Sequence, residues 1–177
     1  MEDIINKVAQ SGLVEFNLED YYDNTEKVSI DFKDFLTAIS LGDGIGEAYI
    51  LKEKPFREMV NNLDLNNYAN KYVAINCSVE AIVPTWAYMV LSIALTPITK
   101  GIVIGSLENL ENVLFNEALQ KVDFSKYEDA KVVIKGCSMH SVPTNAYAQI
   151  AILLKPHAKS LMYGEPCSTV PLYKRPK

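Results

Sequence analysis

Hydrophobic positions along the chain fall into two kinds of segment, short apolar runs and longer stretches with helical spacing. Short runs such as 131–134 (KVVI) are typical of strands that are covered on both faces of a sheet. Apolar residues three and four positions apart, as in 107–119, predict helices. The pattern predicts helices over 54–63, 84–96, 107–119 and 143–155, and strands over 71–76, 101–105, 131–134 and 160–164.

These elements alternate along the chain, which indicates a fold class. Strands joined through helices imply right-handed crossovers and parallel neighbours. We therefore predict an α/β protein with a mostly parallel sheet and helices, built from an internal duplication of a helix–strand–helix–strand unit. Residues 1–45 match no later part of the chain, although 28–32 (VSIDF) alternate as a half-buried strand does. We expect them to form an N-terminal arm that packs on the duplicated domain.

The duplication is visible as a repeat of 59 residues. Gly46, Gly105 and Gly164 are evenly spaced (105 − 46 = 59; 164 − 105 = 59). Pro84 and Pro143 match at the same offset, and so do several aromatic residues. Matching prolines and glycines over this length indicate two copies of one unit. We place the arm at 1–45 and the duplicated α/β domain at 46–177, with copy one at 46–105, copy two at 105–164 and a C-terminal tail at 165–177.

The segments 84–96 and 143–155 differ from the other two predicted helices because they are apolar almost all round. A helix of that kind needs burial on every side. Each helix has one side for the sheet, so a further cover is expected, either the arm or a second subunit. An isologous homodimer through 84–96 and 143–155 would supply that cover.

Composition and charge narrow the classes of partner. The chain of 177 residues is long enough for one domain with a real core, and its formal net charge of −5 argues against nucleic acid as a partner. No apolar run approaches the ~18 residues that a membrane span needs. The acidic start and three cysteines without a disulfide-scaffold pattern predict a reduced, cytoplasmic protein. The basic end, residues 173–177, is expected to be a solvated terminus.

All three cysteines stand in one local setting, Cys-Ser shortly before Val-Pro. Cys77 and Cys137 each follow a predicted strand, and Cys167 comes three residues after the last one. Ligands bind at the carboxyl ends of parallel strands, so we expect a site where these loops meet at one edge. The candidate ligand-binding residues are the three Cys-Ser pairs and a threonine at two helix starts: Cys77, Ser78, Cys137, Ser138, Cys167, Ser168, Thr85 and Thr144.

Three kinds of chemistry remain open for these thiols. The cysteines could converge with His140 on zinc or an iron–sulfur cluster, because thiolates suit such ions. One cysteine could instead be an enzymatic nucleophile or redox thiol. The third alternative is a set of inert thiols, since free cysteine is commonly a small buried apolar group. The serines and threonines could likewise bind an anion or simply cap helices and turns.

The segments 83–88 (VPTWAY) and 163–175 (YGEPCSTVPLYKR) resemble the bacterial family catalogued as domain of unknown function 2480. The likeness covers nearly the whole chain, and it implies one fold unit without an assigned activity. The residues themselves favour a metal- or small-ligand-binding protein. A thiol-dependent enzyme and a non-catalytic homodimeric interaction or scaffold protein are the alternatives.

Overall fold

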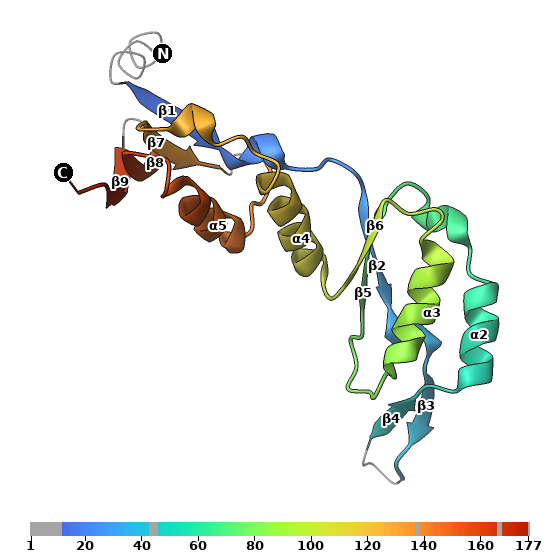
Figure 1. Ribbon diagram of the computed structural model, residues 1–177. Helices are drawn as coiled ribbons and strands as arrows, with labels where there is room; N and C mark the ends of the chain where they lie inside the picture. Colours follow the sequence, from blue (N-terminus) through green and yellow to red (C-terminus); the bar gives the residue numbers. More distant parts are fainter. Residues whose placement is uncertain (1–11, 43–45, 137–138, 166–167, 177) are drawn as a thin grey trace. The chain divides into compact units, whose positions relative to one another are not determined.

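The computed structural model describes residues 12–42, 46–136, 139–165 and 168–176. Over these ranges the protein is a mixed α/β structure with four α-helices and three sheets in which parallel pairs predominate (Figure 1). The chain divides into two compact units. Unit 1 combines 1–23 with 112–177, and unit 2 is the continuous segment 24–111.

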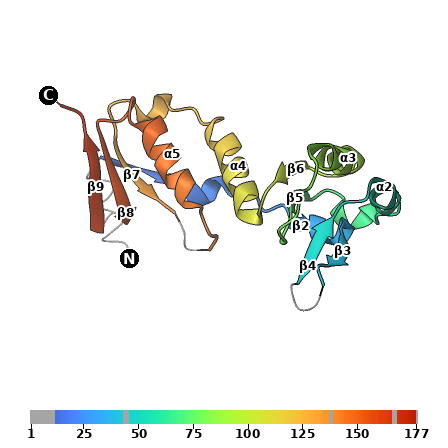
Figure 2. The same ribbon diagram turned by 90° about the horizontal axis from the view of Figure 1, so that it is seen from below.

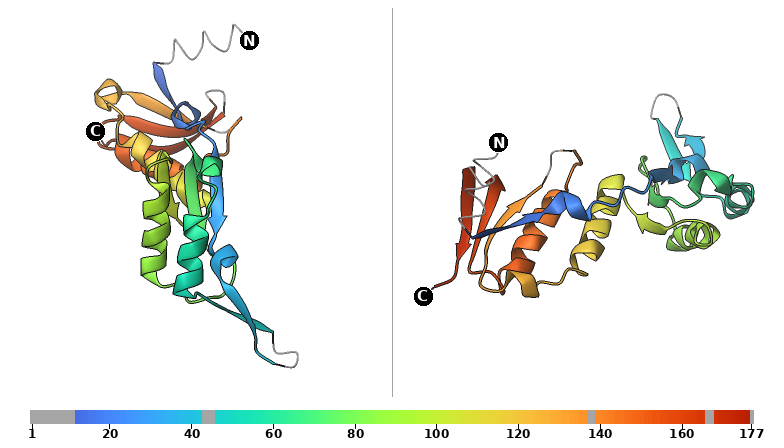
Figure 3. Two further views of the ribbon diagram at one scale, coloured as in Figure 1. Left: turned by 90° about the vertical axis from the view of Figure 1, so that its right-hand side faces the viewer. Right: turned by 90° about the horizontal axis from the view of Figure 1, so that it is seen from above.

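Unit 2 is built on a three-stranded parallel sheet with the order β2-β5-β6. Its strands are β2 (Lys27–Asp31), β5 (Tyr72–Asn76) and β6 (Gly101–Ile104). Helices α2 (Glu53–Asn61) and α3 (Thr85–Leu95) cover one face of this sheet (Figure 2). An antiparallel hairpin of β3 (Thr37–Ser40) and β4 (Glu47–Ile50) extends from the unit (Figure 3). Short 3₁₀ helices complete it, η2 (Phe32–Phe35) and η3 (Leu65–Tyr68).

Unit 1 is built on a four-stranded sheet with the order β1-β7-β8-β9. The strands β1 (Leu13–Asn17), β7 (Lys131–Lys135) and β8 (Ser160–Glu165) run parallel, and β9 (Ser168–Lys174) pairs antiparallel with β8. Helix α5 (Thr144–Leu154) joins β7 to β8. Helix α4 (Leu107–Leu119) begins in the residues of unit 2 and ends in those of unit 1. The 3₁₀ helices are η1 (Leu18–Tyr21) and η4 (Ser125–Tyr127).

Each unit has its own hydrophobic core between sheet and helices. In unit 2, Val73 and Ile75 of β5 meet Leu91 of α3 and Phe56 of α2. In unit 1, Val132 and Ile134 of β7 meet Ile150 of α5 and Phe115 of α4. The central strands β5 and β7 have three consecutive fully buried residues each, as the unbroken apolar runs of the sequence predict.

Local geometry recurs between the units at the offset of 59 residues. Asn70 and Asp129 both adopt positive φ, 59° and 54°. The Asn70 N–H donates to the Ile98 carbonyl (2.8 Å), and the Asp129 N–H donates to the His157 carbonyl (3.0 Å). The first 3₁₀ helix of each unit is capped in the same way, although at another offset (31 − 17 = 14). The side chains of Asn17 and Asp31 cap η1 and η2, and each accepts the backbone N–H two residues later.

The four helices and four strands expected from hydrophobic spacing are confirmed to within about two residues, the usual spread of element ends. The strands β1, β3, β4 and β9 and the short 3₁₀ helices were not among the predicted elements. The hairpin β3–β4 crosses the predicted boundary at residue 45, with β3 in the expected arm and β4 in copy one, and residues 168–174 form β9. The expectation of a solvated C-terminus is wrong for Arg175, whose guanidinium donates to the Pro156 and His157 carbonyls (3.1 and 2.8 Å) and pairs with Asp129.

The segment expected to be one arm supplies a strand to each sheet. β1 pairs with β7 in unit 1, and β2 pairs with β5 in unit 2. The prediction of a mostly parallel sheet therefore holds within each unit, but the strands do not all belong to one sheet. No helix in the described parts of the chain is long and apolar enough to cross a membrane.

Candidate functional site

Cys77 lies directly after β5, at the carboxyl end of the parallel sheet of unit 2. Its side chain is half-buried and packs against the hydrophobic core of that unit. The Sγ–H group points to the Val79 carbonyl, 3.4 Å away. Burial, and then the neighbouring Cys77, raises the pKa of the Tyr88 hydroxyl. These contacts are those of a small core residue with a weak local hydrogen bond.

Ser78 is held by a neighbouring strand end. Its N–H donates to Asp31 Oδ1 (3.0 Å), and the same oxygen accepts the Lys33 N–H (3.0 Å). Burial alone would raise the pKa of Asp31, but hydrogen bonds from Ser78 and from the Lys33 amide outweigh it and lower that pKa. Asp31 therefore fastens the Cys77-Ser78 loop to the start of η2 through its ionised form.

The other candidates stand on different elements. Thr85 and Thr144 are the exposed first residues of α3 and α5, after Pro84 and Pro143 as N-caps. Ser168 is exposed at the start of β9. Cys137, Ser138 and Cys167 lie outside the described residues.

His140 lies in the loop between β7 and α5, where it contacts aromatic and acidic residues of η1 and its end. Its ring stacks on Tyr22 with centroids 4.1 Å apart and planes 5° apart. The backbone N–H of His140 donates to Glu19 Oε1 (3.2 Å), and the same oxygen accepts the backbone N–H of Met139 (2.6 Å). Within the described ranges, no three His, Cys, Asp or Glu side chains come close enough to hold a metal ion.

The common edge expected for the three Cys-Ser loops depended on one sheet. β5, which precedes Cys77, belongs to the three-stranded sheet, whereas β7 and β8, which precede Cys137 and Cys167, belong to the four-stranded sheet. The argument from a single sheet is therefore wrong. A site that unites the three cysteines stays a prediction.

The outer faces of α3 and α5 are a second candidate. Neither helix contains a charged residue, yet each buries only one stripe, Ala87, Leu91 and Leu95 in α3 and Ala146, Ile150 and Leu154 in α5. On α3, Met89 is 59% exposed and Ile93 72%. On α5, Ile152 is 69% exposed. Solvated helix faces normally carry charge, so this apolar exposure makes the two faces candidates for a protein contact.

A hollow of about 360 Å³ adjoins the α3 face. Ser92 and Thr96 of α3 line one side, and Ile102 and Ile104 of β6 line the other. Lys100 also lines the hollow, and its Nζ group donates to Thr25 Oγ1 (2.7 Å). The exposed side of α3 and the strand β6 thus form one continuous surface.

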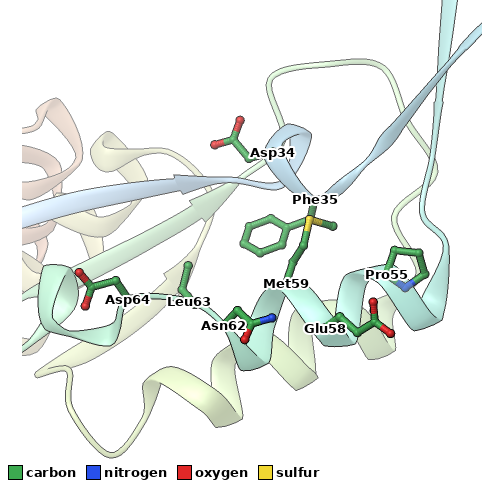
Figure 4. Close-up of a pocket in the computed structure, with 8 residues that line it drawn as sticks. All are labelled: Asp34, Phe35, Pro55, Glu58, Met59, Asn62, Leu63 and Asp64. Atoms are coloured by element: carbon green, nitrogen blue, oxygen red, sulfur yellow. The ribbon is translucent and has the colours of Figure 1, made fainter.

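A larger open groove of about 580 Å³ lies between η2, α2 and the loop after α2 (Figure 4). Phe35, Met59 and Leu63 give it an apolar floor, and Asp34, Glu58 and Asp64 stand around it. Burial, then Asp34 and Asp64, raises the pKa of the nearby Tyr68. The negative rim favours cations over anions. Neither Cys77 nor Ser78 is among the residues that line the groove.

Comparison with known families places the chain. The sequence profile of the family described as "Protein of unknown function (DUF2480)" matches residues 2–175. The chain belongs to this family. The match spans both units of the DUF2480 protein, so the two units together correspond to the family's sequence. No curated protein and no solved structure matches the chain.

Of these two surfaces of the DUF2480 protein, the sequence gives a signal for one only. The groove beside α2 has no signal in the sequence, because η2 and α2 are separated by the hairpin β3–β4. The helix faces did have one, the all-round apolar composition of 84–96 and 143–155. It correctly marked unusual surfaces, although the chain itself buries only one side of each helix.

Proposed function

We propose that this DUF2480 protein is a non-catalytic interaction protein that forms a homodimer through the outer faces of α3 and α5. The observation that carries the proposal is the exposure of Met89, Ile93 and Ile152 on helices without any charged residue. Large exposed apolar patches on a folded protein are typical of protein contacts. The matching helices of the two units would give each chain two such contacts.

The direct test is the mass of the protein in solution. Sedimentation velocity and light scattering over a wide concentration range should give a dimer that dissociates on dilution. A monomer at every concentration would contradict the proposal.

We also infer that the two units descend from one duplicated unit. Both have a parallel three-strand core in which a helix joins the second and third strands, and the turns at Asn70 and Asp129 agree in φ and in hydrogen bonding. In this interpretation residues 13–21 and 27–35 are also counterparts, each a strand followed by a 3₁₀ helix. The copies are then longer than 46–105 and 105–164, because each takes its first strand from the N-terminal segment.

The metal-binding and thiol-enzyme alternatives predict different measurements. Metal binding requires stoichiometric zinc or iron in purified, tag-free protein. A thiol enzyme requires one cysteine that reacts with iodoacetamide much faster than free cysteine. Under our proposal no metal is bound, and Cys77 reacts slowly because its half-buried thiol bonds to the Val79 carbonyl. Either a stoichiometric metal or a fast Cys77 would replace the proposal.

A further inference from the structure

The sheets of the two units differ at the outer edge of their last parallel strand. In unit 1 the outer edge of β8 is covered by the antiparallel strand β9. In unit 2, β6 is the last strand of the sheet, and no strand in the described parts of the chain pairs with its outer edge. An uncovered edge presents a row of unpaired N–H and C=O groups, which is a template for another strand.

β6 is short, with four residues, but it lacks two other features that commonly protect an edge, a charged residue and a proline. β9 carries Pro171, and its pairing with β8 shifts register between Leu161 and Met162, so it is a poor template for further pairing. β2, at the other edge of the unit 2 sheet, has Lys27 at its start and Asp31 at its end. By contrast β6 (Gly101–Ile104) contains neither a charge nor a proline.

The surface beside this edge combines isoleucine with hydroxyl side chains and adjoins α3. Ile104 is 52% exposed and lines the hollow opposite Ser92 and Thr96. Met89, Ser92, Ile93 and Thr96 are spaced at i, i+3, i+4 and i+7, so they share one face of the helix. A strand added at β6 would therefore lie next to the exposed stripe of α3.

We infer that β6 pairs antiparallel with β6 of a second copy of this chain, so that the two three-stranded sheets become one. This inference rests on the proposed homodimer and names its central contact. A two-fold axis perpendicular to the sheet makes the strands antiparallel and keeps both α3 helices on the same side of it, so their apolar stripes face each other. An unrelated partner would need its own matching helix, whereas a second copy supplies both strand and helix.

The charges beside the strand are compatible with this symmetry. Lys100 directly precedes β6 and is its nearest charged neighbour on that side. When Ile102 pairs with itself across the axis, each Lys100 stands opposite Ile104 of the other copy. The two ammonium groups then lie at opposite ends of the paired strands, about 13 Å apart along them, beyond a Debye length at ordinary salt.

Hydrogen–deuterium exchange of the full-length protein tests the pairing. Exchange at the β6 amides is compared at protein concentrations above and below those at which the dimer dissociates. Where about nine-tenths of the chains are dimeric, the β6 amides that become hydrogen-bonded should exchange roughly tenfold more slowly than in the monomer. The amides of β5 are already bonded within the sheet and serve as the internal reference.

A charged variant gives a second measurement. Ile104→Lys places like charges opposite each other in the paired strands, and the exposed position tolerates lysine in the monomer. It should raise the dissociation constant about tenfold or more. Ile50→Lys on β4, 38% exposed in the same unit, is the matched control and should leave it within about twofold.

Each outcome has one meaning. Slower exchange at β6 on dimerisation, with the effect of Ile104→Lys, supports the pairing. A dimer with unchanged β6 exchange overturns the pairing alone and leaves the helix-face dimer intact. A protein that stays monomeric overturns both, and dimers that survive Ile104→Lys unchanged also reject the edge contact.

Discussion

The substitution Ile93→Glu gives the sharpest test of the helix-face dimer. Ile93 lies at the middle of the exposed stripe of α3 and is 72% exposed in the single chain. Complete burial of an isoleucine side chain is worth about 1.5–3 kcal/mol, so covering the part still exposed adds roughly 1–2 kcal/mol per chain. The two-fold interface buries this side chain from both chains, which gives roughly 2–4 kcal/mol, or about 25- to 700-fold in the dissociation constant.

Glutamate removes this contribution and adds a cost. A carboxylate enclosed by the apolar stripe of the partner has no cation to pair with on α3, and an uncompensated buried charge costs several kcal/mol more. We therefore expect Ile93→Glu to sediment as a monomer from about 1 to about 100 μM, where the unmodified protein dimerises.

The control is Leu41→Glu, which introduces the same charge at a residue 51% exposed beside the β3–β4 hairpin of the same unit. It should leave the dimer unchanged. Both variants should keep the thermal midpoint of the parent monomer, because neither residue belongs to the core. An Ile93→Glu protein that dimerises as tightly as its parent would refute the reasoning from apolar exposure.

Three further substitutions test how the loops and chain ends are held, each measured by urea unfolding. Asp31→Ala removes the carboxylate that holds two backbone N–H groups and should cost about 1 kcal/mol at neutral pH. The folded state lowers the pKa of Asp31. The stability difference between the two proteins is therefore complete at pH values above the ordinary pKa of 3.8, and it should disappear as the pH falls through the lower pKa of the folded state. Arg175→Ala should cost about 1–2 kcal/mol because the guanidinium bonds two carbonyls after α5, while exposed Lys174→Ala should change stability by less than about 0.5 kcal/mol. Gly164→Ala puts a Cβ 2.7 Å from a β9 carbonyl oxygen at φ +115°, so it should lose about 1–3 kcal/mol more than Gly46→Ala, where φ is +112° and the space is open.

The four helices and the four strands over 71–76, 101–105, 131–134 and 160–164 could be predicted because their signals are local. The stop of α5 before Pro156 and the buried run of β7 need only neighbouring residues to specify them. β9 was missed since Pro171 within it and its basic end resemble a loose terminus. Its place depends on β8, with which the register shifts by a residue to accommodate the irregular strand.

The partition of the strands between two sheets could not be predicted, for a related reason. Periodicity shows that a segment is a strand, but pairing is decided by contacts far away in sequence. Phe16 of β1 packs with Tyr127 of η4, over a hundred residues on, and nothing in residues 13–17 indicates this partner. The same limit applies to the Cys-Ser site, whose geometry was inferred from a single sheet.

The path of the chain has a consequence for its synthesis. Unit 2 is continuous, whereas unit 1 begins at β1 and is completed only by β7, β8 and β9 near the other end. On the ribosome, residues 24–111 emerge as a whole and are free to acquire their native contacts while β1 still lacks a neighbour. The strand β1 therefore has no strand partner through most of translation. We expect the slowest step of folding to be the closure of the long chain loop between β1 and β7.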